Sequence, residues 1–130
     1  MHFDTDNPNP KILCVDDEEI NLEILEEALE DNYNLQMVES AEACLEFVNQ
    51  CQPELILLDV NMPGMNGFEA CKILKSNPKS CAIPIVFITA LGREIEREEG
   101  FNSGGDAYVT KPFEEDILLS TINQALSLNI

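Results

Sequence analysis

Basic residues are scarce in this chain of 130 residues, which has seven lysine and arginine residues against 25 aspartate and glutamate residues. The formal net charge is −18. Binding to the phosphate backbone of a nucleic acid needs a basic face, and docking on an anionic membrane surface needs basic clusters. The charge therefore argues against nucleic acid as a direct ligand and against membrane binding.

Long hydrophobic runs are also absent, because no apolar run approaches the roughly 20 residues of a membrane-spanning helix. The first ten residues are polar and rich in turn-forming residues, unlike a secretory signal. The hydrophobic content of 45% is that of an ordinary globular protein. We expect a cytoplasmic protein with no membrane insertion and a single domain at residues 10–128, preceded by a flexible segment at residues 1–9.

The patterns that bind zinc or form a disulfide framework are missing as well. The five cysteines are an odd number without a C-x-x-C pair, and the only histidine is His2. We interpret most of the cysteines as small buried hydrophobic residues. Free thiols of this kind fit a reducing compartment.

Strand-like and helix-like segments alternate along the chain. The continuous apolar runs at 54–58 and 84–89 are typical of strands buried on both faces of a parallel sheet, whereas the alternating segment 34–39 predicts an edge or near-edge strand. Further strands are predicted at 11–15 and 107–109, and helices near 20–29, 40–48, 68–74, 91–102 and 117–126. Five strands alternating with five helices imply an α/β fold, a doubly wound parallel sheet with right-handed crossovers.

The first predicted helix combines an apolar stripe with a strongly acidic surface. Apolar residues at helical spacing predict its buried face: Ile20, Ile24, Leu25, Ala28 and Leu29. Nine acidic residues and no lysine or arginine lie from Asp16 to Asp31. A solvated charged face explains most of that charge, and a basic docking patch on a partner is the alternative interpretation.

Polar side chains stand at the carboxyl end of four predicted strands. Asp16 and Asp17 follow the first strand, Asp59 the third, Thr89 ends the fourth, and Lys111 follows the fifth. Each residue alone has an ordinary structural explanation, such as an aspartate at a helix N-terminus. Because carboxyl ends of parallel strands meet at one edge, their coincidence predicts a functional site there.

The charge balance of this predicted site favours a metal ion. Three carboxylates meet only one ammonium group, that of Lys111, and like charges repel strongly when they are partly desolvated. A divalent cation would bring the sum to zero. A site of oxygen ligands with room for water suits Mg²⁺, or Mn²⁺ in its place.

Four runs of the sequence, CVDDEEIN, LILLDVNMPGMNGFE, FITALG and GGDAYVTKPF, resemble the receiver domain of two-component response regulators over nearly all of residues 11–127. The similarity is to single-domain regulators of the chemotaxis type. It implies a flavodoxin-like (βα)5 fold with strand order 2-1-3-4-5. It also implies a signalling switch rather than an enzyme, with only self-phosphorylation and slow self-dephosphorylation. We recognise no output module after Leu126, so we expect the domain to act through protein contacts, either as a stand-alone receiver or as the receiver of a longer regulator or hybrid kinase.

The resemblance also implies the roles of the site residues. Asp59 is the phosphoacceptor for a sensor histidine kinase or a histidine phosphotransfer protein. Asp17 and Asp59 would bind Mg²⁺ directly together with the backbone carbonyl of Asn61, and Asp16 would act mainly through water. Lys111 would contact the phosphoryl group.

A switch is implied in the same way. The Thr89 hydroxyl would bond to the phosphoryl group, and Tyr108 would swing inward. This movement would change the surface of residues 91–127, where an effector protein or domain would bind. The resemblance further predicts a cis Lys111–Pro112 bond, and it places Leu91 over the face from which water attacks the acyl phosphate, which predicts slow hydrolysis.

Two other classes of protein share parts of this pattern. An aspartyl-phosphate hydrolase of the haloacid dehalogenase type would be expected to show D-x-D, with its second aspartate as general acid–base. Here the sequence is Asp59-Val60-Asn61, and an amide cannot shuttle protons. A flavin-binding electron carrier would need a hydroxyl- and glycine-rich phosphate loop after the first strand, where an acidic pair stands instead.

Overall fold

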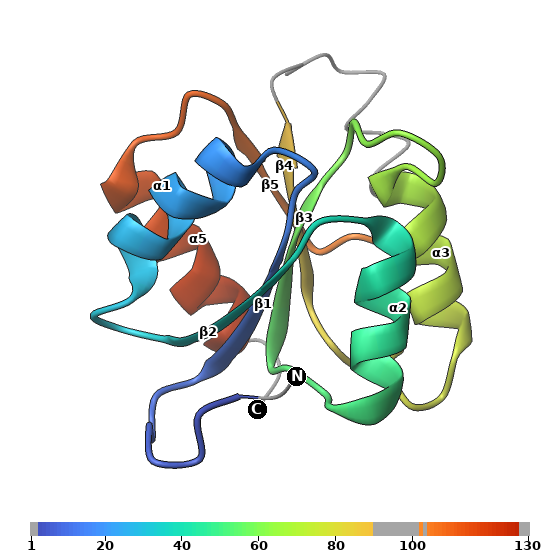
Figure 1. The fold of residues 1–130 in the computed structure, drawn as a ribbon, viewed down its shortest axis with the longest axis horizontal. Helices are drawn as coiled ribbons and strands as arrows, with labels where there is room; N and C mark the ends of the chain where they lie inside the picture. Colours follow the sequence, from blue (N-terminus) through green and yellow to red (C-terminus); the bar gives the residue numbers. More distant parts are fainter. Residues whose placement is uncertain (1–2, 90–101, 103, 128–130) are drawn as a thin grey trace.

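A computed structural model of the chain, which describes residues 3–89, 102 and 104–127, shows strands and helices in alternation (Figure 1). The strands are β1 (Lys11–Val15), β2 (Asn34–Val38), β3 (Leu55–Asp59), β4 (Ile85–Thr89) and β5 (Ala107–Thr110). The helices are α1 (Glu19–Leu29), α2 (Ala41–Gln50), α3 (Gly67–Ser76) and α5 (Glu115–Ser127). The helix predicted near 91–102 falls almost entirely outside the described residues. Within them, no helix is long and apolar enough to cross a membrane.

The five strands form one parallel sheet in the order β2-β1-β3-β4-β5, which confirms the predicted fold class and strand order. Helices α1 and α5 cover one face, and α2 and α3 cover the other (Figure 1). Every residue of β3 and β4 is buried, because helices lie on both sides of these central strands. Strand β2 is an edge strand, as its alternating pattern predicts, and its middle residues are only partly buried.

The apolar stripe of α1 differs from the predicted one in its first turns. Leu22, Leu25 and Leu29 are the buried residues of the helix, whereas Ile20 and Ile24 are 63% and 47% exposed. Residues three and seven positions apart lie on the same face of a helix, so Leu22 continues the line of Leu25 and Leu29 toward the N-terminus. Ile20 and Ile24 lie to one side of this line and remain exposed to solvent.

The N-terminal segment packs against the domain. The ring of Phe3 is 3% exposed and meets the ring of Phe47 edge to face, with 5.5 Å between the ring centroids. The Asn34 side-chain amide donates a hydrogen bond to the carbonyl oxygen of Asp4 at 2.7 Å. A buried aromatic ring and a buried amide thus hold residues that the sequence alone places in a flexible segment. The domain limits at residues 10 and 128 stay a prediction.

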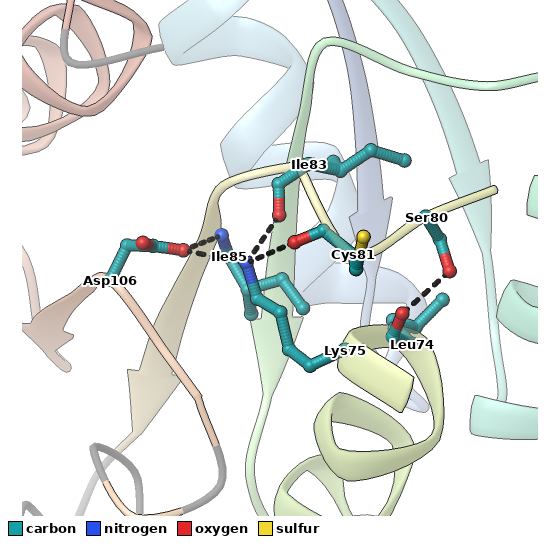
Figure 2. Close-up of polar contacts among 7 residues, drawn as sticks. All are labelled: Leu74, Lys75, Ser80, Cys81, Ile83, Ile85 and Asp106. Atoms are coloured by element: carbon teal, nitrogen blue, oxygen red, sulfur yellow. Dashed lines mark hydrogen bonds and ion pairs between the residues drawn. The ribbon is translucent and has the colours of Figure 1, made fainter. Parts of the chain in front are cut away.

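A lysine–aspartate contact joins α3 to the beginnings of β4 and β5 (Figure 2). Lys75 Nζ lies 3.1 Å from Asp106 Oδ2 and donates to the carbonyl oxygens of Ile83 at 2.8 Å and Cys81 at 3.4 Å. The same Asp106 oxygen accepts the backbone N–H of Ile85 at 2.8 Å. This junction holds the amino ends of β4 and β5 side by side, at the opposite end of the sheet from the predicted site.

We expect Asp106→Ala to lower the free energy of unfolding by about 1–3 kcal/mol, because the Ile85 N–H would lose its acceptor and the Lys75 ammonium group would lose one of three. Urea unfolding followed by circular dichroism measures this change. The matched control is Asp31→Ala, at an exposed position that forms no salt bridge with any described residue, and we expect a change within about 0.5 kcal/mol. Equal effects of the two substitutions would show that the junction does not contribute to stability.

Candidate functional site

A lysine bridges two buried carboxylates at the carboxyl end of the sheet. Lys111 Nζ, just after β5, lies 2.9 Å from Asp16 Oδ2 and 3.4 Å from Asp59 Oδ1. Asp16 follows β1 and is 1% exposed, and Asp59 ends β3 and is 5% exposed. The structure therefore brings together three of the residues that the sequence places at this edge.

Burial and charge shift the protonation of this cluster. The pKa of Asp59 is raised from 3.8 to about 6, with burial as the largest cause. The negative charge of Asp16 also raises this pKa, and Lys111 opposes both effects. Burial by itself would lower the pKa of Lys111, but its hydrogen bond to Asp16 and the charges of both carboxylates outweigh burial and raise that pKa. The single ammonium group therefore neutralises the carboxylates only in part.

A group of three acidic side chains lies beside this lysine. Carboxylate oxygens of Asp16, Asp17 and Glu18 lie within 4.8 Å of one another. Both Asp16 oxygens are already engaged, since Oδ1 accepts the Glu18 backbone N–H at 3.0 Å and Oδ2 accepts Lys111. Asp17 and Glu18 are exposed. Oxygen donors with unneutralised negative charge fit a hard divalent cation such as Mg²⁺.

The acidic group and the predicted metal ligands overlap only in part. The sequence pattern selects Asp16, Asp17, Asp59 and Asn61, whereas Glu18 joins the acidic group and Asp59 lies outside that group of three. Asn61 is exposed in the connection between β3 and α3. The acidic run DDEE is the only signal in the sequence that could have selected Glu18.

The two predicted switch residues lie on neighbouring strands. Thr89 ends β4 and is fully buried, and its carbonyl oxygen accepts the backbone N–H of Lys111 at 2.7 Å. Tyr108 on β5 is partly buried and stands opposite Phe87 in the strand register, with 5.7 Å between their ring centroids. Tyr108 thus packs beside the strand that carries Thr89. The Lys111–Pro112 bond is cis, which confirms that prediction, and Leu91 lies outside the described residues.

Gly67 is a positioning residue that the sequence analysis does not select. A Cβ atom at this position would lie 2.4 Å from the carbonyl oxygen of Asp59 and 3.0 Å from the Cα of Val60. The Gly67 N–H donates to the Val60 carbonyl at 2.9 Å. Glycine thus lets the start of α3 lie directly against the backbone of the candidate acceptor.

The raised pKa of Asp59 predicts a dependence of stability on pH. Because this pKa rises from 3.8 to about 6 on folding, the folded state binds the extra proton in that range, and this contribution to stability is lost as the pH rises through it. We expect Asp59→Asn to exceed the wild type in stability at about pH 8, by on the order of 1–3 kcal/mol, and this advantage to shrink toward about pH 4. Urea unfolding in EDTA measures the difference. An advantage that is equal at both pH values would contradict the shifted pKa.

The comparisons with known proteins agree with this geometry. The family model of the response regulator receiver domain matches residues 12–123 of this chain. The chain is 38% identical over 113 residues to response regulator PleD of Caulobacter vibrioides, covering 86% of this chain and 25% of PleD. It is 33% identical over 118 residues to RpaA of Synechocystis, a DNA-binding transcriptional regulator, covering 90% of this chain and 49% of RpaA. The chain thus spans a quarter to about half the length of these relatives.

Relatives and solved structures of similar length also match. The chain is 33% identical over 118 residues to protein PilH of Pseudomonas aeruginosa, covering 90% of this chain and 98% of PilH. The crystal structure of a response regulator from Chloroflexus aurantiacus has a TM-score of 0.88 at 30% identity, over 92% of this chain and 98% of that one. For chemotaxis protein CheY4 of Vibrio cholerae the TM-score is 0.86 at 27% identity, over 90% and 98% of the two chains. The chain belongs to the receiver-domain family of two-component response regulators.

Proposed function

We propose that Asp59 accepts a phosphoryl group from a phosphohistidine on a sensor histidine kinase or a histidine phosphotransfer protein. The observation that carries this proposal is the buried pair of carboxylates, Asp16 and Asp59, on either side of the Lys111 ammonium group. Phosphoryl transfer needs mainly alignment and neutralisation of charge, and this cluster is placed to supply both. Family membership supports the same assignment.

The proposed transfer forms one bond to Asp59 and breaks one bond to the histidine. An ionised Asp59 oxygen attacks phosphorus, the bond from phosphorus to the histidine nitrogen breaks, and that nitrogen keeps the electron pair. The Lys111 ammonium group stabilises charge on the phosphoryl oxygens, and the Thr89 hydroxyl donates to one of them. The product is an acyl phosphate on Asp59, which water slowly hydrolyses. Such a domain is a switch with self-directed chemistry rather than an enzyme with a separate substrate.

The carboxylates of Asp16, Asp17 and Asp59 and the backbone carbonyl of Asn61 are the groups that would hold Mg²⁺ or Mn²⁺. When bound, the ion would offset negative charge on the phosphoryl oxygens. Both Asp16 oxygens accept hydrogen bonds from protein groups, which favours an indirect role for Asp16 through water. Asp17 is exposed and follows Asp16 directly, which favours direct coordination by its carboxylate.

The output of the switch is proposed to run from Thr89 to Tyr108. A new bond from the Thr89 hydroxyl to the phosphoryl group would draw that side chain toward Asp59. The Tyr108 ring, which packs against Phe87 on the same strand as Thr89, would then move inward. The surface of residues 91–127 would change and bind an effector protein or domain. We place these events in the cytoplasm, which suits a chain whose five cysteines form no disulfide.

We expect the chain to gain one phosphoryl group when it is incubated with Mg²⁺ and acetyl phosphate, as measured by intact-mass spectrometry. Asp59→Asn keeps the shape of the side chain but removes the nucleophile, so this variant should gain none. Asp31→Asn removes an exposed carboxylate outside the site and is the matched control, which should be labelled like the wild type. Equal labelling of Asp59→Asn would overturn the assignment of the acceptor.

We expect Mg²⁺ to raise the melting temperature, because it binds the folded state and relieves repulsion among the carboxylates. Asp17→Asn should lose most of this increase, whereas Asp31→Asn should keep it. Differential scanning fluorimetry in Mg²⁺ and in EDTA measures the effect. The same melting temperature in both solutions would show that the metal site is misassigned.

A further inference from the structure

A groove of about 700 Å³ runs along the open edge of the sheet, between α1, the carboxyl half of β2 and the start of α2. Its apolar lining includes Leu22 and Met37. Four glutamates also line it: Glu19, Glu23, Glu26 and Glu39. All four are exposed, and among the residues that the structure describes none of them forms a salt bridge.

Strand β2 offers backbone groups to this groove. On its inner side the Asn34 N–H donates to the Pro10 carbonyl, and the Val38 carbonyl accepts the Asp16 N–H. Backbone groups of successive strand residues point to opposite edges, so those of Met37 point away from β1 toward the open edge. The groove thus combines an apolar lining with the Met37 backbone groups, which form no hydrogen bond with any residue that the structure describes.

The negative charge around the groove indicates which kind of partner could bind there. No lysine or arginine occurs between Lys11 and Lys72, a stretch that includes α1, β2 and α2. A second copy of this chain would bring its own net charge of −18 against these glutamates, so self-association at this edge is disfavoured. A cationic partner would instead be attracted, because the glutamates would steer its positive charges to the groove and pair with them there.

We propose that this groove binds an extended, lysine- or arginine-rich segment of a partner protein as an added strand on β2. Its basic side chains would pair with the four glutamates, and an apolar side chain between them would contact Leu22 and Met37. The β2 edge and the β5 edge are the two opposite edges of the sheet. This surface is therefore separate from the one proposed for the effector, and its occupation does not require phosphorylation of Asp59.

The test uses the full chain labelled with ¹⁵N and a synthetic peptide of repeated Lys-Thr-Val-Thr with acetylated and amidated ends. Residues two positions apart in a strand point to the same face, so lysine and valine would both face α1 in this peptide. The control peptide has glutamate in place of lysine. We expect the lysine peptide to bind at low salt and to shift amide signals of residues 19–26 and 37–43. Hydrogen exchange of the Met37 amide should slow when the peptide is bound, because an added strand would accept a hydrogen bond from it.

Two triple variants remove the same charge from different places. The combination Glu23→Gln, Glu26→Gln and Glu39→Gln removes groove carboxylates and should weaken binding by about tenfold or more. The combination Glu27→Gln, Glu30→Gln and Glu46→Gln removes exposed carboxylates that do not line the groove, and should change the dissociation constant by less than about twofold. Circular dichroism checks that both variants are folded.

Equal weakening by the two triple variants would overturn the proposal, because it would show attraction by net charge alone. No binding of the lysine peptide at low salt, equal binding of the glutamate peptide, an unchanged Met37 exchange rate, or shifts centred on residues 16–18 and 59 would overturn it as well. Labelling by acetyl phosphate is measured on the same variants. Neither triple variant alters Asp59, Lys111 or Thr89. An error in the proposed peptide site would therefore appear in the binding data, and an error in the proposed acceptor would appear in the labelling data.

Discussion

The Lys111 ammonium group lies between the carboxylates of Asp16 and Asp59, and it ties the ends of three strands into one site. Strand β4 lies between β3 and β5 in the sheet, so a long side chain is needed to reach from the end of β5 to Asp59. Without this cation the two buried carboxylates would repel each other at low dielectric. With it, the pKa of Asp59 is still raised to about 6, and the remaining negative charge is what a divalent cation can offset.

This electrostatic arrangement depends on a rigid frame that is built elsewhere in the molecule. The central strands are buried by two apolar layers, one under α2 and α3 and one under α1 and α5. Gly67 lets α3 begin against the backbone of Asp59, and the contact of Lys75 with Asp106 holds β4 and β5 together at the other end. Backbone packing therefore places the acceptor, and side-chain charge sets its protonation.

Much of the fold could be predicted, because strands buried on both faces leave continuous apolar runs and because strand ends carry polar residues. Which individual side chains are buried or join the site depends on contacts with residues distant in the sequence, and a local sequence pattern does not contain these contacts. Ile20 and Ile24 fit a helical stripe, but the position of α1 on the sheet buries Leu22 instead. Phe3 lies in a polar segment, and only its contact with Phe47 reveals its role in the core. Glu18 joins the acidic group through the geometry of the turn after β1, which spacing along the chain cannot fix.

The most direct measurement of the central claim is the pKa of the Asp59 side chain, followed by ¹³C nuclear magnetic resonance of its carboxyl carbon across a pH titration. In the absence of divalent ions we expect a pKa of about 6, because of burial and the charge of Asp16. In Mg²⁺ we expect a pKa lower by at least about one unit, since a nearby cation favours the ionised carboxylate. A value near 3.8 without the ion, unchanged when Mg²⁺ is added, would contradict a buried and charge-crowded acceptor at this position.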